Sequence, residues 1–88
     1  MEPIRELIAV DLEMTGLQVK TDRILEIGAV RLVDGQLRDT FQTFVNPHRR
    51  IDARITELTG IRPEMVEDAP EAEEALRKFL EFAGEGPF

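Results

Sequence analysis

Two carboxylates separated by a single residue, Asp11 and Glu13, directly follow a short apolar run at residues 7–10. An extended chain alternates its side chains between two faces, so both carboxylates should leave the same face, roughly 6.6 Å apart along the strand at ~3.3 Å per residue. Two ionised carboxylates this close repel each other, and a hard divalent ion such as Mg²⁺ or Mn²⁺ would hold both. The pair therefore predicts an oxygen-ligand metal site, although most such pairs are solvated charges at the edge of a loop.

The residues that follow are suited to hold a substrate. Thr15 supplies a hydroxyl, and Gly16 has no Cβ, so a phosphate or a sugar can approach its backbone closely. In open α/β sheets, ligands bind beyond the carboxyl ends of the strands, which is where these residues are expected to lie. We therefore expect the candidate site at the end of the first strand.

Other polar residues are interpreted as surface or structural groups. His48 lies in a polar loop, where a solvated side chain is the expectation. Glu26 interrupts an apolar run and is expected to pair with a neighbouring arginine. Thr59 has a hydroxyl that could satisfy the end of a helix; its other interpretation depends on the family resemblance given below. One local group of basic residues could meet a nucleic-acid backbone or balance the charge of an acidic protein; it comprises Arg49, Arg50, Arg54 and Arg62.

Composition excludes several other chemistries. The 88 residues contain no Cys and one His, so a thiolate site and a histidine cluster are both excluded. Eighteen acidic against eleven basic residues give a net charge of −7, which argues against nonspecific binding of nucleic acid across the whole surface. No run approaches the ~20 apolar residues of a membrane helix, and the first residues do not resemble a secretory signal, so we expect one small cytoplasmic domain.

The first half of the sequence predicts three strands. The first strand is expected to be covered on both faces, inside a sheet. The second contains Gly28, where a bulge or a close approach of backbone is expected. Asp34 and Gly35 supply a strong hairpin signal before the third strand, which alternates as an edge strand that is wet on one face. The predicted strands span residues 7–10, 24–32 and 37–45.

After Pro47 the hydrophobic period changes to that of a helix. A first helix should begin near Asp52 and end before Gly60, and one more turn could form at residues 63–66. A second helix should begin at Pro70 and end at Gly84. Apolar residues at helical spacing predict the buried faces: Ile51, Ile55 and Leu58 for the first helix, and Ala72, Leu76, Phe79, Leu80 and Ala83 for the second.

Five segments of the sequence carry a family pattern. They are residues 10–17 (Val-Asp-Leu-Glu-Met-Thr-Gly-Leu), 22–30 (Asp-Arg-Ile-Leu-Glu-Ile-Gly-Ala-Val), 44–47 (Phe-Val-Asn-Pro), 55–61 (Ile-Thr-Glu-Leu-Thr-Gly-Ile) and 68–70 (Asp-Ala-Pro). Together they resemble the DEDD, or DnaQ-like, 3′–5′ exonucleases, and the resemblance covers about residues 7–88. Within that family the similarity is to the exonuclease segments associated with the polymerase III alpha chain of Gram-positive type and with some DinG-type helicases.

The resemblance implies an α/β fold of the ribonuclease H-like (exonuclease) type. The chain would hold an incomplete form of it, namely the three-stranded antiparallel start of a mixed sheet followed by two helices. Residues 1–88 would form a single partial domain, with strands and the first metal motif in residues 7–45 and helices in residues 51–83. In that fold the first strand is central, so its edge at residues 7–12 would be open to dimerisation or aggregation.

The resemblance also implies roles for individual residues. Asp11 and Glu13 would be the catalytic residues and would ligate two divalent ions, Mg²⁺ or Mn²⁺, with Asp11 bridging them. Several residues after the acidic pair would contact the terminal nucleotide, and Leu17 would pack near its base. The implied substrate-binding residues are Met14, Thr15, Gly16, Leu17 and Thr59.

The implied reaction is the metal-dependent removal of nucleotides from the 3′ ends of DNA, of a proofreading or repair type. The substrate would be a single-stranded or frayed 3′ end, and polymerase or helicase modules would be the protein partners. The family's further acidic ligands and its general base have no counterpart before Phe88. We therefore expect a truncated fragment of an exonuclease that is inactive alone; the alternative is a catalytically silent domain that docks a DNA polymerase or helicase.

Overall fold

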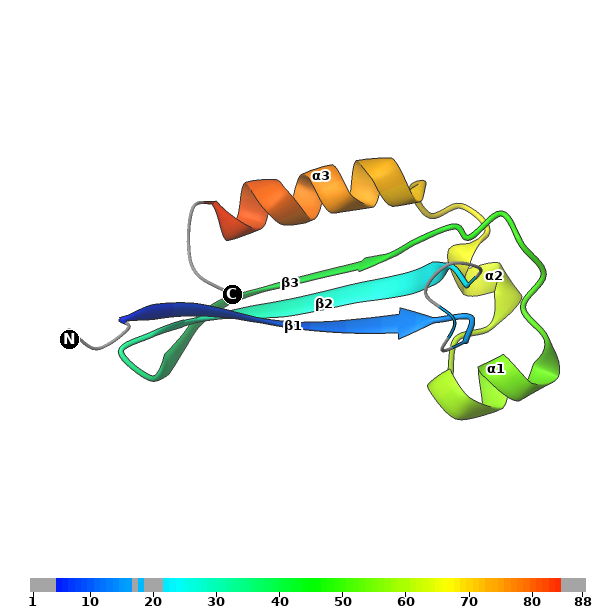
Figure 1. Cartoon of the computed structure of the whole chain (residues 1–88), viewed down its shortest axis with the longest axis horizontal. Helices are drawn as coiled ribbons and strands as arrows, with labels where there is room; N and C mark the ends of the chain where they lie inside the picture. Colours follow the sequence, from blue (N-terminus) through cyan, green and yellow to red (C-terminus); the bar gives the residue numbers. More distant parts are fainter. Residues whose placement is uncertain (1–4, 17, 19–21, 85–88) are drawn as a thin grey trace.

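The computed structural model describes residues 5–16, 18 and 22–84. Helix α3 lies along one face of the sheet, and α1 and α2 gather beyond the end of β1 (Figure 1). The predicted three-stranded antiparallel start of the sheet, followed by helices, is confirmed. The strands are β1 (Glu6–Met14), β2 (Ile24–Val33) and β3 (Gln36–Phe44), and the helices are α1 (Ala53–Thr59), α2 (Pro63–Val66) and α3 (Ala72–Ala83).

The three strands pair in the order β1-β2-β3, with both pairs antiparallel. Asp34 and Gly35 join β2 to β3 with φ of 52° and 80°, the positive values that a two-residue type I′ hairpin requires. The bulge expected at Gly28 is wrong, because the register shifts after Glu13 and after Arg31 instead. A Cβ at Gly28 would meet the Asp11 carbonyl oxygen at 3.9 Å, an ordinary contact, so no close approach requires this glycine.

In the described part of the chain, β1 lies at an edge of the sheet, as the family resemblance implied for an incomplete sheet. Val10 and Leu12 are each 43% exposed. The prediction that residues 7–10 are covered on both faces is therefore wrong for all but Ile8, which is buried. The cause is the position of α3, which packs mainly on β2 and β3. Strand β3 is the other edge, as expected, with Arg38, Thr40 and Gln42 of its predicted wet face exposed.

The core under α3 is built from small and aromatic residues of the helix. Ala75 and Ala83 are buried, and the rings of Phe79 and Phe82 pack beside them against the sheet. Alanines let the helix approach the sheet closely, and the phenylalanines fill the space on either side. The predicted stripe is correct at Phe79 and Ala83 but wrong at three positions, which are exposed: Ala72, Leu76 and Leu80.

A second core cluster fixes α1 and α2 at the end of the sheet. It contains Leu25, Ile51, Ile61 and Val66. The side chain of Asp52 accepts a hydrogen bond from the Ile55 N–H at 3.0 Å at the start of α1. Gly60, with φ of 79°, closes the helix and confirms the predicted end. The extra turn predicted at residues 63–66 is α2. No helix in residues 5–16, 18 and 22–84 is long and apolar enough to cross a membrane.

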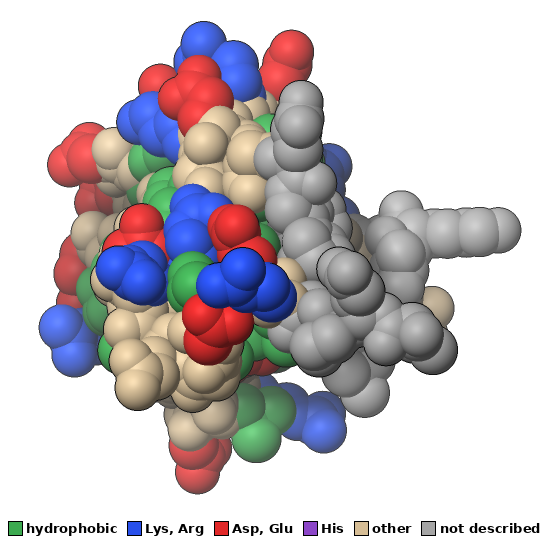
Figure 2. Space-filling model, turned by 90° about the vertical axis from the view of Figure 1, so that its left-hand side faces the viewer, with side chains coloured by type: hydrophobic (Ala, Val, Ile, Leu, Met, Phe, Trp, Pro, Cys, Tyr) green, Lys and Arg blue, Asp and Glu red, His purple; other side chains and the backbone are tan. Residues whose placement is uncertain are grey.

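Arg31 ties the far end of α3 to the sheet. Its Nη1 lies 2.8 Å from Glu6 Oε1 and its Nε lies 2.9 Å from Asp39 Oδ1. The guanidinium also donates to the Phe82 carbonyl and lies 4.6 Å from the centre of the Phe82 ring. The hydrogen bond to Glu6 is the main cause that raises the pKa of Arg31. Basic and acidic side chains lie side by side at this end of the molecule (Figure 2).

We expect the 88-residue chain to associate with itself through β1. The open N–H and C=O groups of an edge strand template pairing with another chain, and exposed Val10 and Leu12 lie beside them. Val10→Lys should reduce this association, because a charge on an edge strand opposes pairing. Leu80→Lys, the same kind of change on the exposed side of α3, should not.

Sedimentation velocity at about tens of micromolar checks this prediction. A parent chain that stays monomeric, melts cooperatively and shows slow amide exchange at Ile8 and Val10 would contradict it.

Candidate functional site

The two carboxylates of the candidate site lie near the end of β1. Ile8 packs against Ala83 of α3, so the alternating residues Asp11 and Glu13 leave the opposite face of the sheet. Asp11 pairs in register with Gly28, and the register shift follows Glu13 directly. A bulge of this kind bends a strand and re-aims the side chains beside it, so the chain turns where the site begins.

A cleft of about 390 Å³ lies beside Glu13. It brings together three of the predicted site residues from β1 and its following loop with Thr59 from the end of α1. Asp11 does not line this cleft but borders a separate shallow depression with Gly28 and Gln42. Leu17 lies outside the described residues. The cleft is lined by Leu12, Glu13, Met14, Gly16, Ile55, Leu58 and Thr59.

One wall of the cleft is apolar, and the sequence did not indicate it. Leu58 was expected on the buried face of α1, but it is 74% exposed and borders the cleft instead. Ile55 packs into the core cluster below and also reaches the cleft, and Leu12 reaches it from β1. A periodic apolar pattern identifies the apolar face of a helix but does not say whether protein or ligand covers that face.

The Thr59 hydroxyl is used within the protein. It donates to the Ile55 carbonyl oxygen at 2.8 Å and accepts from the Ile61 N–H at 3.0 Å. These bonds satisfy backbone groups that the end of α1 would otherwise leave open. Thr59 therefore stabilises the end of α1, and because it lies there it also forms part of the cleft wall.

The Thr15 hydroxyl is also engaged. It donates to Asp22 Oδ1 at 2.8 Å and accepts from the Arg23 N–H at 2.9 Å. The other oxygen of Asp22 accepts from the Gln18 N–H at 2.9 Å. A Cβ at Gly16 would lie 2.5 Å from that oxygen, so the glycine is required by the carboxylate behind the loop. Sequence reasoning gave Asp22 no role, because its partners are identified only once the loop is folded.

Hydrogen bonds lower the pKa of Asp22 below its ordinary value, first from the Gln18 backbone and then from Thr15, with Arg49 adding to the effect. The carboxylate is therefore ionised at neutral pH. Because the folded pKa is the lower one, its contribution to stability is present above the ordinary pKa near 3.8 and is lost as the pH falls through the folded value.

The charges around the acidic pair define what the site can hold. Glu26 lies directly opposite Glu13 in the sheet, and it accepts a hydrogen bond from Gln42 Nε2 at 2.7 Å; the expected arginine partner is not found among the described residues. Asp11 and Glu13 offer the oxygen donors that hard divalent ions prefer. Within residues 5–16, 18 and 22–84, however, no three His, Asp or Glu side chains gather closely enough to hold a metal ion.

The basic group identified in the sequence is divided between different roles. Arg49 Nη1 lies 3.7 Å from Asp22 Oδ1, and Arg62 Nε pairs with Glu64 at 2.7 Å. His48 is exposed, as expected, and its Nε2 lies 3.1 Å from Glu71 Oε1.

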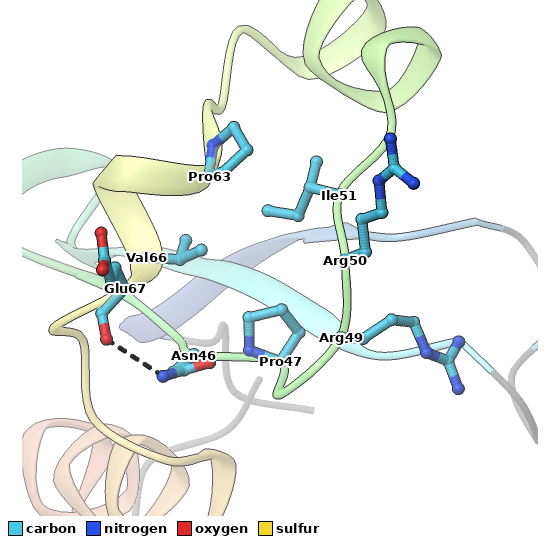
Figure 3. A pocket seen from close by; sticks show the side chains of 8 residues that line it. All are labelled: Asn46, Pro47, Arg49, Arg50, Ile51, Pro63, Val66 and Glu67. Carbon is cyan, nitrogen blue, oxygen red and sulfur yellow. Dashed lines mark hydrogen bonds between the residues drawn. The ribbon is translucent and has the colours of Figure 1, made fainter.

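A second cavity, of about 560 Å³, lies under α2. Asn46 Nδ2 donates to the Glu67 carbonyl oxygen at 3.1 Å on one side of it, and Arg49 and Arg50 extend away from its apolar wall (Figure 3). Its lining residues are Asn46, Pro47, Arg49, Arg50, Ile51, Pro63, Val66 and Glu67. We assign no ligand to this cavity.

Residues 8–87 match the family model RNase_T, whose description is "Exonuclease". The chain belongs to this exonuclease family. It is 54% identical over 78 residues to the PolC-type DNA polymerase III of Caldanaerobacter subterraneus subsp. tengcongensis, a match that covers 89% of the chain and 6% of the polymerase. The exonuclease chain thus spans a small fraction of the curated relatives it matches, and the predicted family is confirmed.

Solved structures agree with this family. The nuclease domain of 3′hExo, a DEDDh family member bound to rAMP, superposes with a TM-score of 0.81 at 25% identity, over 91% of this chain and 44% of that one. Exonuclease X in complex with 5′ overhanging duplex DNA superposes with a TM-score of 0.73 at 30% identity, over 83% of this chain and 42% of that one. The predicted ribonuclease H-like fold is confirmed, and the chain holds part of that domain.

Gly16→Ala should destabilise the exonuclease chain by about 1–3 kcal/mol. The new Cβ would overlap the Asp22 carboxylate, which must then break its hydrogen bonds to Thr15 and Gln18. Gly28→Ala is the matched control, because a Cβ there meets only an ordinary contact and removes the flexibility of glycine from a strand. Urea denaturation of both variants checks the difference; equal midpoints would show that the loop accommodates the methyl group.

The chain alone should bind Mn²⁺ only weakly, with a dissociation constant above about 0.1 mM, because two carboxylates leave most of the ion's coordination to water. Asp11→Asn should abolish the residual paramagnetic broadening of nearby resonances. Asp34→Asn, at the distant hairpin, should leave it unchanged, since Asn-Gly also forms a type I′ turn. Sub-micromolar affinity, or broadening that persists in Asp11→Asn, would refute this assignment.

Proposed function

We propose that the chain is the amino-terminal part of a 3′–5′ exonuclease domain that removes nucleotides from the ends of DNA. The observation that carries the proposal is the cleft at the end of β1, where Glu13, the loop after it and the end of α1 meet. Residues far apart in the sequence are thus gathered around one carboxylate of the predicted metal pair. Membership of the exonuclease family supports the reaction class.

Asp11 and Glu13 are the proposed catalytic residues. They would hold divalent ions, Mg²⁺ or Mn²⁺, which when bound supply activation of water and neutralisation of charge on the phosphodiester. The relatives' domain is longer than this chain, so the remaining ligands for two ions would come from sequence beyond the described residues. The donors at β1 are carboxylate oxygens, which suit Mg²⁺ or Mn²⁺ better than metals that prefer thiolate or imidazole ligands.

The terminal nucleotide is proposed to occupy the cleft. Its base or sugar would pack against Ile55 and Leu58, which offer apolar surface beside Glu13. Met14 and Gly16 border the same cleft, where their backbone groups would contact the nucleotide. The Thr15 and Thr59 hydroxyls form hydrogen bonds within the protein. We therefore propose that these two residues shape the cleft and that their hydroxyls do not contact the substrate directly.

The substrate is proposed to be a single-stranded or frayed 3′ end of DNA, since the terminal nucleotide must enter the cleft unpaired. DNA is favoured over RNA because the chain is 54% identical to part of a DNA polymerase. A polymerase module is accordingly the proposed partner, and the cytoplasm is the proposed location. The rAMP bound to 3′hExo makes RNA the competing polymer to be tested beside DNA.

The test is a chimera in which this chain replaces the matching segment of the Caldanaerobacter PolC-type polymerase. We expect the chimera to release nucleotides from the 3′ end of single-stranded DNA in a reaction that EDTA stops. Glu13→Gln should lower the rate at least about a thousandfold, because members of a cooperating catalytic set are not replaceable singly. Glu57→Gln, an exposed change on α1, is the matched control.

The 88-residue chain alone should release no nucleotides. Release that EDTA and Glu13→Gln abolish would show that the 88-residue chain already contains a complete site. A folded chimera without nuclease activity on DNA or RNA would instead favour the catalytically silent docking domain.

A further inference from the structure

We propose that Asp22 is a positioning residue of the exonuclease site. Its carboxylate fixes the loop that follows β1 and thereby sets the wall of the cleft beside Glu13. This inference rests on the proposed function, because the cleft is taken to receive the terminal nucleotide.

Both carboxylate oxygens of Asp22 bind the loop. One accepts from the Thr15 hydroxyl at 2.8 Å and the other from the Gln18 N–H at 2.9 Å. These two donors lie on either side of Gly16, which borders the cleft. A single side chain, only 17% exposed, therefore holds the loop both before and after the residue that faces the substrate.

Thr15 connects this carboxylate to the backbone that enters β2. Its hydroxyl accepts from the Arg23 N–H at 2.9 Å, and its own N–H donates to the Arg23 carbonyl oxygen at 2.8 Å. These hydrogen bonds of Thr15 close the loop onto the segment next to Asp22. The one to the Asp22 carboxylate is charge-assisted and hence the strongest of them. None of these bonds involves Asp11 or Glu13.

The contact at Gly16 transmits the position of the carboxylate to the cleft. A Cβ at this residue would lie 2.5 Å from Asp22 Oδ2, so the backbone of the cleft wall rests directly against the carboxylate. If Asp22 is removed, the space behind Gly16 opens and the wall loses its support. The terminal nucleotide would then meet a wall without a fixed shape.

Arg49 extends the arrangement toward α1, which lines the cleft. It lies on the connection between β3 and α1, and its side chain points away from the neighbouring cavity (Figure 3). Its Nη1 lies 3.7 Å from Asp22 Oδ1, a separation at which charge attraction supports the carboxylate without a hydrogen bond. Asp22 thus links the loop after β1 to the segment that leads into α1, and the loop and α1 both line the cleft.

The structural step is tested by amide hydrogen exchange in the 88-residue chain. Thr15→Val removes the hydroxyl but keeps the volume, and it should speed exchange at the Gln18 amide about tenfold, although Thr15 does not bind that amide. Asp22→Ala should do the same at the Thr15 amide. Thr15→Ser keeps the hydroxyl and should stay within about twofold of the parent.

Exchange at Ile27, in the core of β2, is the internal standard for global stability, and Asp68→Ala is the matched surface control. Unchanged exchange at Gln18 in Thr15→Val, with Ile27 also unchanged, would overturn the proposal. Equal effects of Thr15→Ser and Thr15→Val would overturn it as well, because they would show that the hydroxyl is not the connecting group.

The functional step is tested in the polymerase chimera. Asp22→Ala and Thr15→Val should each raise KM for single-stranded DNA about tenfold, with less effect on kcat, while Mn²⁺ affinity stays at the parent value. The double variant should resemble either single variant, because both break one connection. Additive losses, or loss of Mn²⁺ binding, would contradict a positioning role. An inactive parent chimera would count against the proposed nuclease function, and the exchange results would still decide whether Asp22 holds the loop.

Discussion

Strand β2 is the constraint on which the rest of the structure depends. It has a paired strand on both sides, and its alternate residues Leu25, Ile27 and Ala29 point to one face. Each of the three belongs to a different core cluster, one under α1 and α2 and two under α3. All three helices are therefore positioned by packing on β2. A slip of β2 by one residue would expose all three clusters at once.

The same alternation separates packing from chemistry. Away from the ion-paired end at Arg31 and Glu6, the residues of β1 and β2 that face α3 are apolar. The residues between them, Asp11, Glu13 and Glu26, leave the other face. Acidic groups can therefore lie close together without entering the core, where uncompensated charge would be costly. The cleft forms where this acidic face meets α1, which the cluster around Leu25 holds at the end of the sheet.

Features set by local chemistry could be predicted from the sequence. The hairpin at Asp34 and Gly35 and the end of α1 at Gly60 follow from backbone preferences of two or three residues, and both are found. The spacing of Asp11 and Glu13 similarly indicated their common face. Features set by which elements pack together could not be read in the same way. The buried face of α3 is shifted from the one predicted. The small side chain of Ala75 and the ring of Phe82 pack against the sheet, whereas Leu76 and Leu80 are exposed.

The contact between Gly16 and Asp22 also constrains how this loop can evolve. A side chain at Gly16 becomes acceptable only when the carboxylate moves, and a moved carboxylate abandons the Thr15 hydroxyl and the Gln18 N–H. A single substitution that adds a side chain at Gly16, or removes the Thr15 hydroxyl or the Asp22 carboxylate, thus passes through a damaged intermediate. Apart from an exchange of Thr15 for Ser, which keeps the hydroxyl, the three positions should change together or not at all.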